Sequence, residues 1–363
     1  MNIFGWTLTE LAEGIRPLGL PSYAPRQIAE WLYGKHATTF DAMTNLSLDA
    51  RRALAERFGI ERAAPVERAV SADGTCKYLF PAGSTRDAFV ETAVIPDAGR
   101  FTLCLSTQIG CRRACRFCAT GALGFHGQLS TGAILNQYAS LPERDRITNI
   151  VYMGMGEPLD NLDAVLRSLE IFTADWGYRM SPTRLTVSTV GILPALERLI
   201  TESRCHIALS VHSPFPEERR RWIPAEATHP LARSLETLRR ARIGGQRRLM
   251  IEYIPFAGLN DTPKHARALA RRLQGLRCRI NLIPFNPTGN PALPASDPRR
   301  MEAFQAELQQ HGFVVTIRKS RGADIAAACG LLAKIRPSDR PAEGSVAEDA
   351  AASAASGAPS TQP

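Results

Sequence analysis

The sequence lacks any long apolar run. No stretch among its 363 residues reaches the roughly eighteen apolar positions that a membrane-spanning helix needs, so no span is expected. The first residues, MNIFGWTLTELAEG, also lack a basic segment followed by an apolar one, so a secretory leader is not expected. These absences favour a cytoplasmic protein that does not contact a membrane.

Cysteine and acidic residues are both scarce. Eight cysteines in a chain of this length, four of them clustered, do not resemble a disulfide scaffold, and they favour metal or redox chemistry in a reducing compartment. Only 35 Asp and Glu face 44 Lys and Arg, which gives a net charge of +9. This balance favours a polyanionic partner such as RNA, although charge alone does not require one.

The chain divides by pattern into four parts. Residues 1–65 are predicted to form a helical domain, because Ile28, Trp31 and Leu32 recur at helical spacing; it is either a solvated bundle or an RNA-contacting module. Residues 66–98 alternate like a small β extension with a hairpin at Asp73-Gly74. Residues 99–336 form the core, and 337–363, rich in Ala, Ser and Pro, are predicted to be a disordered tail.

The core repeats strand and helix patterns in regular alternation. Such β/α units build a parallel sheet through right-handed crossovers, so the fold class is α/β. Six units are too few for a closed eight-stranded barrel, so we expect a partial (β/α)6 barrel with its site at the carboxyl ends of the strands. The predicted strands are residues 101–106, 149–155, 184–189, 206–212, 249–255 and 279–285, with a further strand at 313–319.

Three cysteines follow the first core strand with the spacing C-x3-C-x2-C, at Cys111, Cys115 and Cys118. Structural zinc prefers four ligands and would have to recruit Cys104 or His126, which the spacing suits poorly. A [4Fe-4S] cluster held by three thiolates would leave one iron open for another ligand. The cluster is favoured; zinc in a non-catalytic RNA-binding protein and ordinary buried thiols are the alternatives.

This motif after a first barrel strand resembles the signature of radical S-adenosylmethionine (SAM) enzymes, in which the open iron binds SAM. The core is therefore expected to be a radical SAM barrel. Polar groups and glycines at later strand ends fit one SAM pocket, although each taken singly is also an ordinary turn or cap residue. The predicted SAM-binding residues are Gly156, Glu157, Ser188, Ser210, Val211, His212 and Asn286.

The collinear order of motifs over roughly residues 10–336 resembles the RlmN/Cfr family of radical SAM RNA methyltransferases. The motifs include RQIAEWLYG, DGTCKYLF, VETAVIP, GMGEP, STVG, LSVHSP, INLIPFNP and RKSRGADIAAACG. The resemblance implies methylation of an adenosine in 23S rRNA, at the peptidyl-transferase centre, and of tRNA, at adenine C2. Methylation at C8, or another radical SAM substrate, is the alternative. It further implies a monomer and an external electron donor such as flavodoxin or ferredoxin.

The resemblance also implies three catalytic residues. Cys329 is methylated by one SAM, and a radical from a second SAM activates that methyl group for transfer through a transient protein–RNA crosslink. Cys104, seven positions before Cys111, resolves the crosslink by forming a transient disulfide with Cys329. Glu91 accepts the ring proton, and an apolar setting would raise its pKa toward neutrality. Without the resemblance, both cysteines read as core residues and Glu91 as an exposed strand residue.

Overall fold

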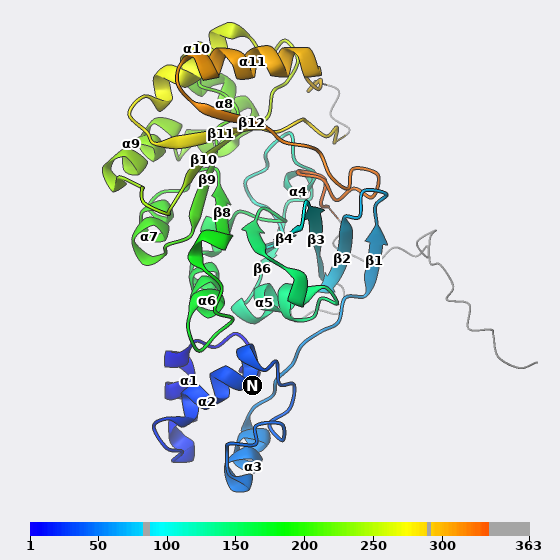
Figure 1. The fold of residues 1–363 in the computed structure, drawn as a ribbon, viewed down its shortest axis with the longest axis vertical. Helices are drawn as coiled ribbons and strands as arrows, with labels where there is room; N and C mark the ends of the chain where they lie inside the picture. Colours follow the sequence, from blue (N-terminus) through cyan, green and yellow to red (C-terminus); the bar gives the residue numbers. More distant parts are fainter. Residues whose placement is uncertain (83–87, 289–291, 334–363) are drawn as a thin grey trace, which may run out of the picture.

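A computed structural model describes residues 1–82, 88–288 and 292–333. The predicted tail at 337–363 and the last residues of the predicted core lie outside this range. Within it, a ten-stranded sheet runs through the molecule with helices on its flanks, and the N-terminal helices lie below one end (Figure 1).

The N-terminal region is helical, as its periodicity predicts. Its helices are α1 (Leu8–Ile15), α2 (Ala24–Ala29), a wider π turn (Glu30–Gly34) and α3 (Leu48–Arg57). Thr7 and Glu10 cap α1 reciprocally, each side chain accepting from the other's backbone N–H. The aromatic ring of Tyr33 packs against Trp176 and Tyr178 of the core, so apolar contact fixes the helices to the sheet domain.

The β extension continues directly into the main sheet. Antiparallel strands β1 (Glu67–Val70), β2 (Cys76–Pro81) and β3 (Phe89–Asp97) lead to β4 (Arg100–Cys104). The β1–β2 turn closes with a hydrogen bond from Gly74 N to Ser71 O of 2.9 Å, and Gly74 adopts a φ of +83° that favours glycine. This turn contains the predicted Asp73-Gly74 pair.

From β4 onward the strands are parallel and lie in the order of the sequence. They are β4, β7 (Asn149–Tyr152), β8 (Leu185–Thr189), β9 (His206–Ser210), β10 (Leu249–Tyr253), β11 (Cys278–Leu282) and β12 (Val314–Ile317). Within the described residues β1 and β12 are the edges, so the sheet stays open. The predicted α/β fold, a partial rather than a closed barrel, is confirmed, and β12 is the further strand predicted at 313–319.

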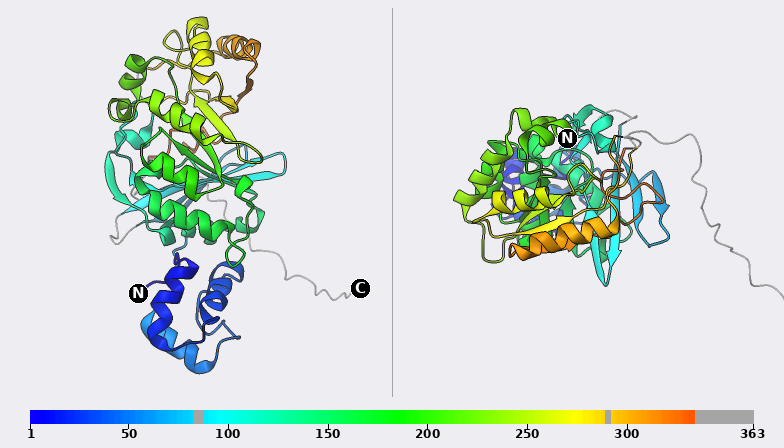
Figure 2. Two further views of the ribbon diagram at one scale, coloured as in Figure 1. Left: turned by 90° about the vertical axis from the view of Figure 1, so that its left-hand side faces the viewer. Right: turned by 90° about the horizontal axis from the view of Figure 1, so that it is seen from above.

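Helices cover the sheet between successive strands (Figure 2). They are α5 (Thr131–Ala139), α6 (Leu162–Thr173), α7 (Ala195–Glu202), α8 (Pro216–Trp222), α9 (Leu231–Ala241), α10 (Pro263–Leu273) and α11 (Pro298–Gln310). Shorter pieces follow β4: β5 (Gln108–Gly110), α4 (Ala119–Ala122) and β6 (Phe125–Gln128), with β5 and β6 forming a small antiparallel ribbon.

The core lies between the parallel strands and these helices. Ile150, Val187, Ile207, Ile251 and Ile280, one from each of five neighbouring strands, have no exposed surface. Apolar burial on both faces is what a parallel sheet flanked by helices requires, and it leaves the strand ends to carry polar groups. In the part of the chain that the structure describes, no helix is both long and apolar enough to cross a bilayer.

Candidate active site

The three motif cysteines lie on one loop between β5 and α4, and all three thiols line the same cavity. The loop is folded on itself: Cys111 N donates to Gly124 O (2.7 Å) and Cys118 N donates to Cys115 O (3.1 Å). Gly121 has to be small, because a Cβ there would lie 2.9 Å from both N and O of Cys115. The backbone therefore wraps tightly and turns its thiols toward one space.

The donor set fits an iron–sulfur cluster, because three cysteine thiols line one cavity. Burial raises the pKa of Cys111 to about 12 and raises the pKa of Cys115 as well, so these thiols need a cationic partner to become thiolates. Among the described residues, no group of three His, Cys, Asp or Glu side chains is close enough to hold one metal ion. In a four-iron cluster each cysteine binds a different iron, so three thiols around one cavity suit it.

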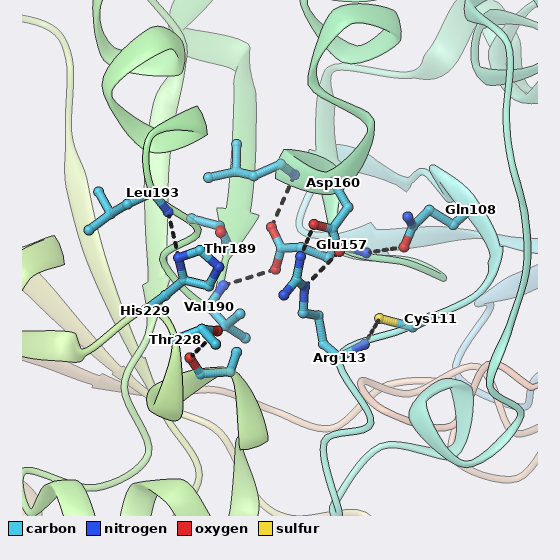
Figure 3. A network of polar contacts seen from close by, with 12 residues as sticks. Gln108, Cys111, Arg113, Glu157, Asp160, Thr189, Val190, Leu193, Thr228 and His229 are labelled. Carbon is cyan, nitrogen blue, oxygen red and sulfur yellow. Dashed lines mark hydrogen bonds and ion pairs between the residues drawn. The ribbon is translucent and has the colours of Figure 1, made fainter.

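Glu157 is the centre of a polar network beside the cysteine loop (Figure 3). Its Oε1 accepts from Leu159 N and its Oε2 from Val190 N, both at 3.0 Å, while its own N–H donates to Gln108 Oε1 at 2.8 Å. The side chain is 4% exposed, and burial raises its pKa to about 7. The carboxylate thus joins the ends of β7 and β8 and lines the cavity.

Gly156 precedes Glu157 and cannot carry a side chain. Its φ is +101°, and a Cβ would lie 2.6 Å from Gln108 Cβ and 2.8 Å from Gln108 N. Arg113 pairs with Asp160 on the other side of the same network, with Nε–Oδ2 at 2.6 Å. Backbone proximity that only glycine permits therefore shapes this wall of the cavity.

Ser188, Ser210 and His212 lie at successive strand ends and line the cavity, where the sequence places them. His212 is buried, and its Nδ1 accepts from Ile254 N at 3.0 Å. Burial lowers its pKa to about 3, so the ring is neutral. It meets Phe117 of the cysteine loop edge to face, with ring centroids 4.7 Å apart. The β9 end and the cysteine loop are therefore packed together.

Val211 and Asn286 are not among the residues that line the cavity. Val211 is buried, and its backbone N–H donates to Glu252 O at 3.0 Å. Asn286 Nδ2 donates to Cys329 O at 3.2 Å, and its Oδ1 accepts from Ser320 Oγ at 2.6 Å. Asn286 thus contacts the C-terminal segment rather than the cavity wall.

Cys329 lines the cavity together with Cys111, Cys115 and Cys118. It lies on an irregular segment after β12, and Gly330 O accepts from Ala119 N of α4 at 2.8 Å. Cys329 keeps exposed surface although it lines the cavity, and the pKa of its thiol is raised by desolvation on the cavity side and next by the nearby carboxylate of Glu252. Tertiary structure therefore brings the predicted methyl carrier to the predicted cluster.

Cys104 ends β4 beside the same segment. It is 8% exposed and packs with Ala93 and with Ala327, which is two positions before Cys329. Burial raises the pKa of its thiol, and the neighbouring thiol of Cys329 adds to this effect. Both thiols are free.

Glu91 is buried on β3, 2% exposed, but its setting is not only apolar. Its Oε1 forms an ion pair with Lys77 Nζ at 2.8 Å, and its Oε2 accepts from Ala333 N at 2.8 Å. Leu79 is the partner of Glu91 across the β2–β3 ladder, so Lys77, two positions away, is its diagonal neighbour. The sequence interpretation of an apolar wall missed this lysine.

Sequence reasoning missed two further residues of the site. Arg219 is fully buried, pairs with Glu226, and donates to Val190 O (2.8 Å), Ser210 O (2.9 Å) and Val211 O (3.1 Å). It ties the ends of β8 and β9 together, yet in the run PEERRRW nothing distinguishes it from exposed arginines. Glu252 lines the cavity, 4% exposed, and accepts from Asn281 Nδ2 at 2.9 Å. An acid inside the apolar strand LMIEYIP was the available signal.

Known proteins match these features over nearly the whole chain. A family model for the radical SAM superfamily matches residues 105–273, and one for the N-terminal domain of ribosomal RNA large subunit methyltransferases matches residues 1–60. A probable dual-specificity RNA methyltransferase RlmN from Porphyromonas gingivalis is 50% identical over 330 residues, covering 91% of this chain and 96% of that protein.

Two other relatives agree. The dual-specificity RNA methyltransferase RlmN of Geobacter sulfurreducens is 40% identical over 332 residues, 92% of each chain. The crystal structure of a radical SAM methyltransferase from Sphaerobacter thermophilus has a TM-score of 0.83 at 37% identity and covers 92% of this chain and 99% of that one. Identity at this level over this length shows common descent: the chain belongs to the RlmN family of radical SAM RNA methyltransferases.

Proposed function

We propose that this enzyme methylates C2 of an adenosine in 23S rRNA, at the peptidyl-transferase centre, and of tRNA. The observation that carries the proposal is that Cys329 lines the same cavity as Cys111, Cys115 and Cys118. A radical SAM enzyme that acts without a protein methyl carrier has no need of a cysteine at that place. The relatives' designation as dual-specificity RNA methyltransferases, and the match of residues 1–60 to the N-terminal domain of ribosomal RNA large subunit methyltransferases, support an RNA substrate.

The three cysteines of the loop would hold the [4Fe-4S] cluster, and the strand ends would hold SAM. When bound, these groups supply methyl groups, an electron and a carbon-centred radical that can abstract hydrogen from a methyl group. Glu157 and Gly156 would orient the methionyl part of SAM, and Ser188, Ser210 and His212 the remainder. Val211 would act through its backbone bond to Glu252, and Asn286 through its side-chain bond to the backbone of Cys329. Two SAM molecules are used in each turnover.

Cys329 accepts the first methyl group on sulfur. That methyl group would then lose one hydrogen atom to the carbon-centred radical, and the resulting S–CH2 carbon bonds to the adenine ring carbon. Glu91 then takes the proton from the substituted ring carbon, and the adduct gives up one electron, which the cluster or the external one-electron carrier would accept. Cys104 forms an S–S bond with Cys329 as the C–S bond to the base breaks, and the released carbon takes a proton to become the new methyl group. An external thiol reduces the disulfide before the next turnover.

The proposed reaction also needs an electron source and a reducing compartment. Reductive chemistry requires an external one-electron donor of the flavodoxin or ferredoxin class, and free thiols require a reducing compartment such as the cytoplasm. A monomer suffices for this proposal, because one chain supplies Cys329, Cys104, Glu91 and the three motif cysteines.

The decisive experiment is incubation of the reconstituted enzyme with SAM, a reductant and each RNA, followed by nuclease digestion and mass spectrometry. We expect 2-methyladenosine in both RNAs and a mass increase of one methyl group on the peptide that contains Cys329. Detection of 8-methyladenosine would replace C2 by C8, and methylation of neither RNA would overturn the proposal. Cys329→Ala is expected to abolish product, and Cys278→Ala, away from the cavity, is the matched control.

A further inference from the structure

The segment that carries Cys329 has no regular secondary structure between Arg318 and Ala333. Its path past the sheet is therefore determined by side-chain and loop contacts rather than by a ladder of backbone hydrogen bonds. Several of these contacts converge on the β1–β2 turn, residues 71–75, which no step of the proposed reaction uses.

The turn and the segment exchange hydrogen bonds in both directions. Asp73 of the turn accepts from Gly322 N through Oδ2 at 2.9 Å, while its Oδ1 accepts from Thr75 N at 2.9 Å. Asp324 of the segment accepts from Ser71 Oγ at 2.6 Å and from Ala72 N at 3.2 Å. Each carboxylate thus binds donors of the other element, and hydrogen bonds to charged groups are the stronger class.

The backbone of the segment approaches the turn too closely for a side chain. Gly322 has a φ of +65°, and a Cβ there would lie 2.8 Å from Thr75 Cγ2 and 2.9 Å from Ala327 Cβ. Gly322 O also accepts from Ala327 N at 2.8 Å, which closes a loop that ends two positions before Cys329. Gly322 is therefore joined to the turn by Asp73 and, through this loop, to the residues just before Cys329.

We propose that the β1–β2 turn is a latch for the methyl-carrier segment, with Asp73, Ser71 and Asp324 acting as positioning residues for Cys329. The closed latch holds the thiol at the cavity, where it would accept a methyl group. Opening it frees the segment to carry the methyl group to the base and the sulfur to Cys104. The inference rests on the proposed function in taking Cys329 as the carrier, while the latch itself is a claim about this chain's own contacts.

The hydrogen bonds of the latch can break and re-form in every catalytic cycle. Asp73 is only half-buried and Asp324 is exposed, so water can replace their partners when the segment leaves. Burial opposes ionisation of Asp73, but hydrogen bonds from Thr75 and Gly322 outweigh it and lower its pKa to about 2. The latch is therefore fully charged at neutral pH.

The test is the rate at which iodoacetamide alkylates Cys329 in the full-length holoenzyme, read by peptide mass spectrometry. Asp73→Ala disrupts the contact from the turn, and Gly322→Ala disrupts it from the segment. We expect each variant to raise the alkylation rate roughly tenfold, the factor that loss of one hydrogen bond to a charged group gives. Ser71→Ala and Asp324→Asn should each raise it, and the double variant should raise it by less than the product of the two. Asp163→Asn, in an exposed pair with Arg198, is the control and should not change it.

Hydrogen exchange separates the latch from general unfolding. In the latch variants, amide exchange should become faster in residues 320–333 and stay unchanged in β7 to β11. Faster exchange throughout the chain would overturn the proposal, as would an unchanged alkylation rate.

The latch and the proposed function can be overturned independently of each other. Faster alkylation in the latch variants, together with RNA methylation by Cys329→Ala, would support the latch and overturn the carrier role of Cys329. Loss of product in Cys329→Ala, together with an unchanged alkylation rate in the latch variants, would support the carrier role and overturn the latch.

Discussion

Glu91 Oε2 accepts a 2.8 Å hydrogen bond from the backbone N–H of Ala333, 242 positions later in the chain. The predicted proton acceptor is thus held by the segment that bears the predicted methyl carrier. Lys77 completes the arrangement by pairing with Glu91 Oε1 at 2.8 Å and by donating to Ala326 O at 3.3 Å. One buried ion pair therefore connects the β extension to both sides of Cys329.

Removal of the lysine should destabilise the fold. Lys77→Met leaves the buried carboxylate of Glu91 without its ammonium, and breaking such a pair costs about 3 kcal/mol of unfolding free energy. Urea denaturation measures the loss, and Lys77→Met/Glu91→Gln should recover part of it. Arg198→Met, which breaks exposed pairs, should leave stability nearly unchanged. Equal losses of unfolding free energy in Lys77→Met and Arg198→Met would contradict this interpretation.

Two glycine substitutions separate backbone strain from steric conflict. Gly156→Ala adds a Cβ that meets Gln108 and also forces alanine to a φ of +101°, so we expect a loss of about 3 kcal/mol and no measurable SAM binding. Gly245→Ala has a φ of +66° but nothing within 4 Å of its Cβ, so it should cost only about 1 kcal/mol and leave binding intact. Urea denaturation and calorimetric SAM titration measure both effects, and similar behaviour of the two would refute the close-approach argument.

The buried arginine should matter to both stability and cofactor binding. Arg219→Met removes the donor to three carbonyl groups at the ends of β8 and β9 and leaves Glu226 buried without its charge partner. We expect a loss of about 4 kcal/mol and weaker SAM binding. In a double-mutant cycle with Glu226→Gln, the combined variant should lose less than the sum of the two, and additive losses would show that the pair is not coupled.

The resolving role of Cys104 predicts a trapped intermediate. Cys104→Ala should still form the bond between Cys329 and the base but should not break it, so protein-linked RNA accumulates in place of methylated product. A denaturing gel with end-labelled RNA detects the adduct, and Cys104→Ala/Cys329→Ala should show none. Normal multiple turnover by Cys104→Ala would eliminate this role.

Local patterns predicted much of this protein, and they did so where the signal is short-ranged. Alternation and helical spacing gave the parallel β/α order, because backbone conformation depends on neighbours a few positions apart. The spacing of Cys111, Cys115 and Cys118 placed three thiols on one loop, and position at strand ends placed Ser188, Ser210 and His212 at one edge of the sheet.

The tertiary structure alone decided the contacts between distant segments of the chain. The pairing of Lys77 with Glu91 depends on the β2–β3 register, and the burial of Arg219 among carbonyl groups depends on how α8 meets the ends of β8 and β9. The seat of Cys329 depends on an irregular segment held by Asp73 and Asn286. No periodicity encodes such a segment, because its path is set by the surfaces it meets once the sheet has formed.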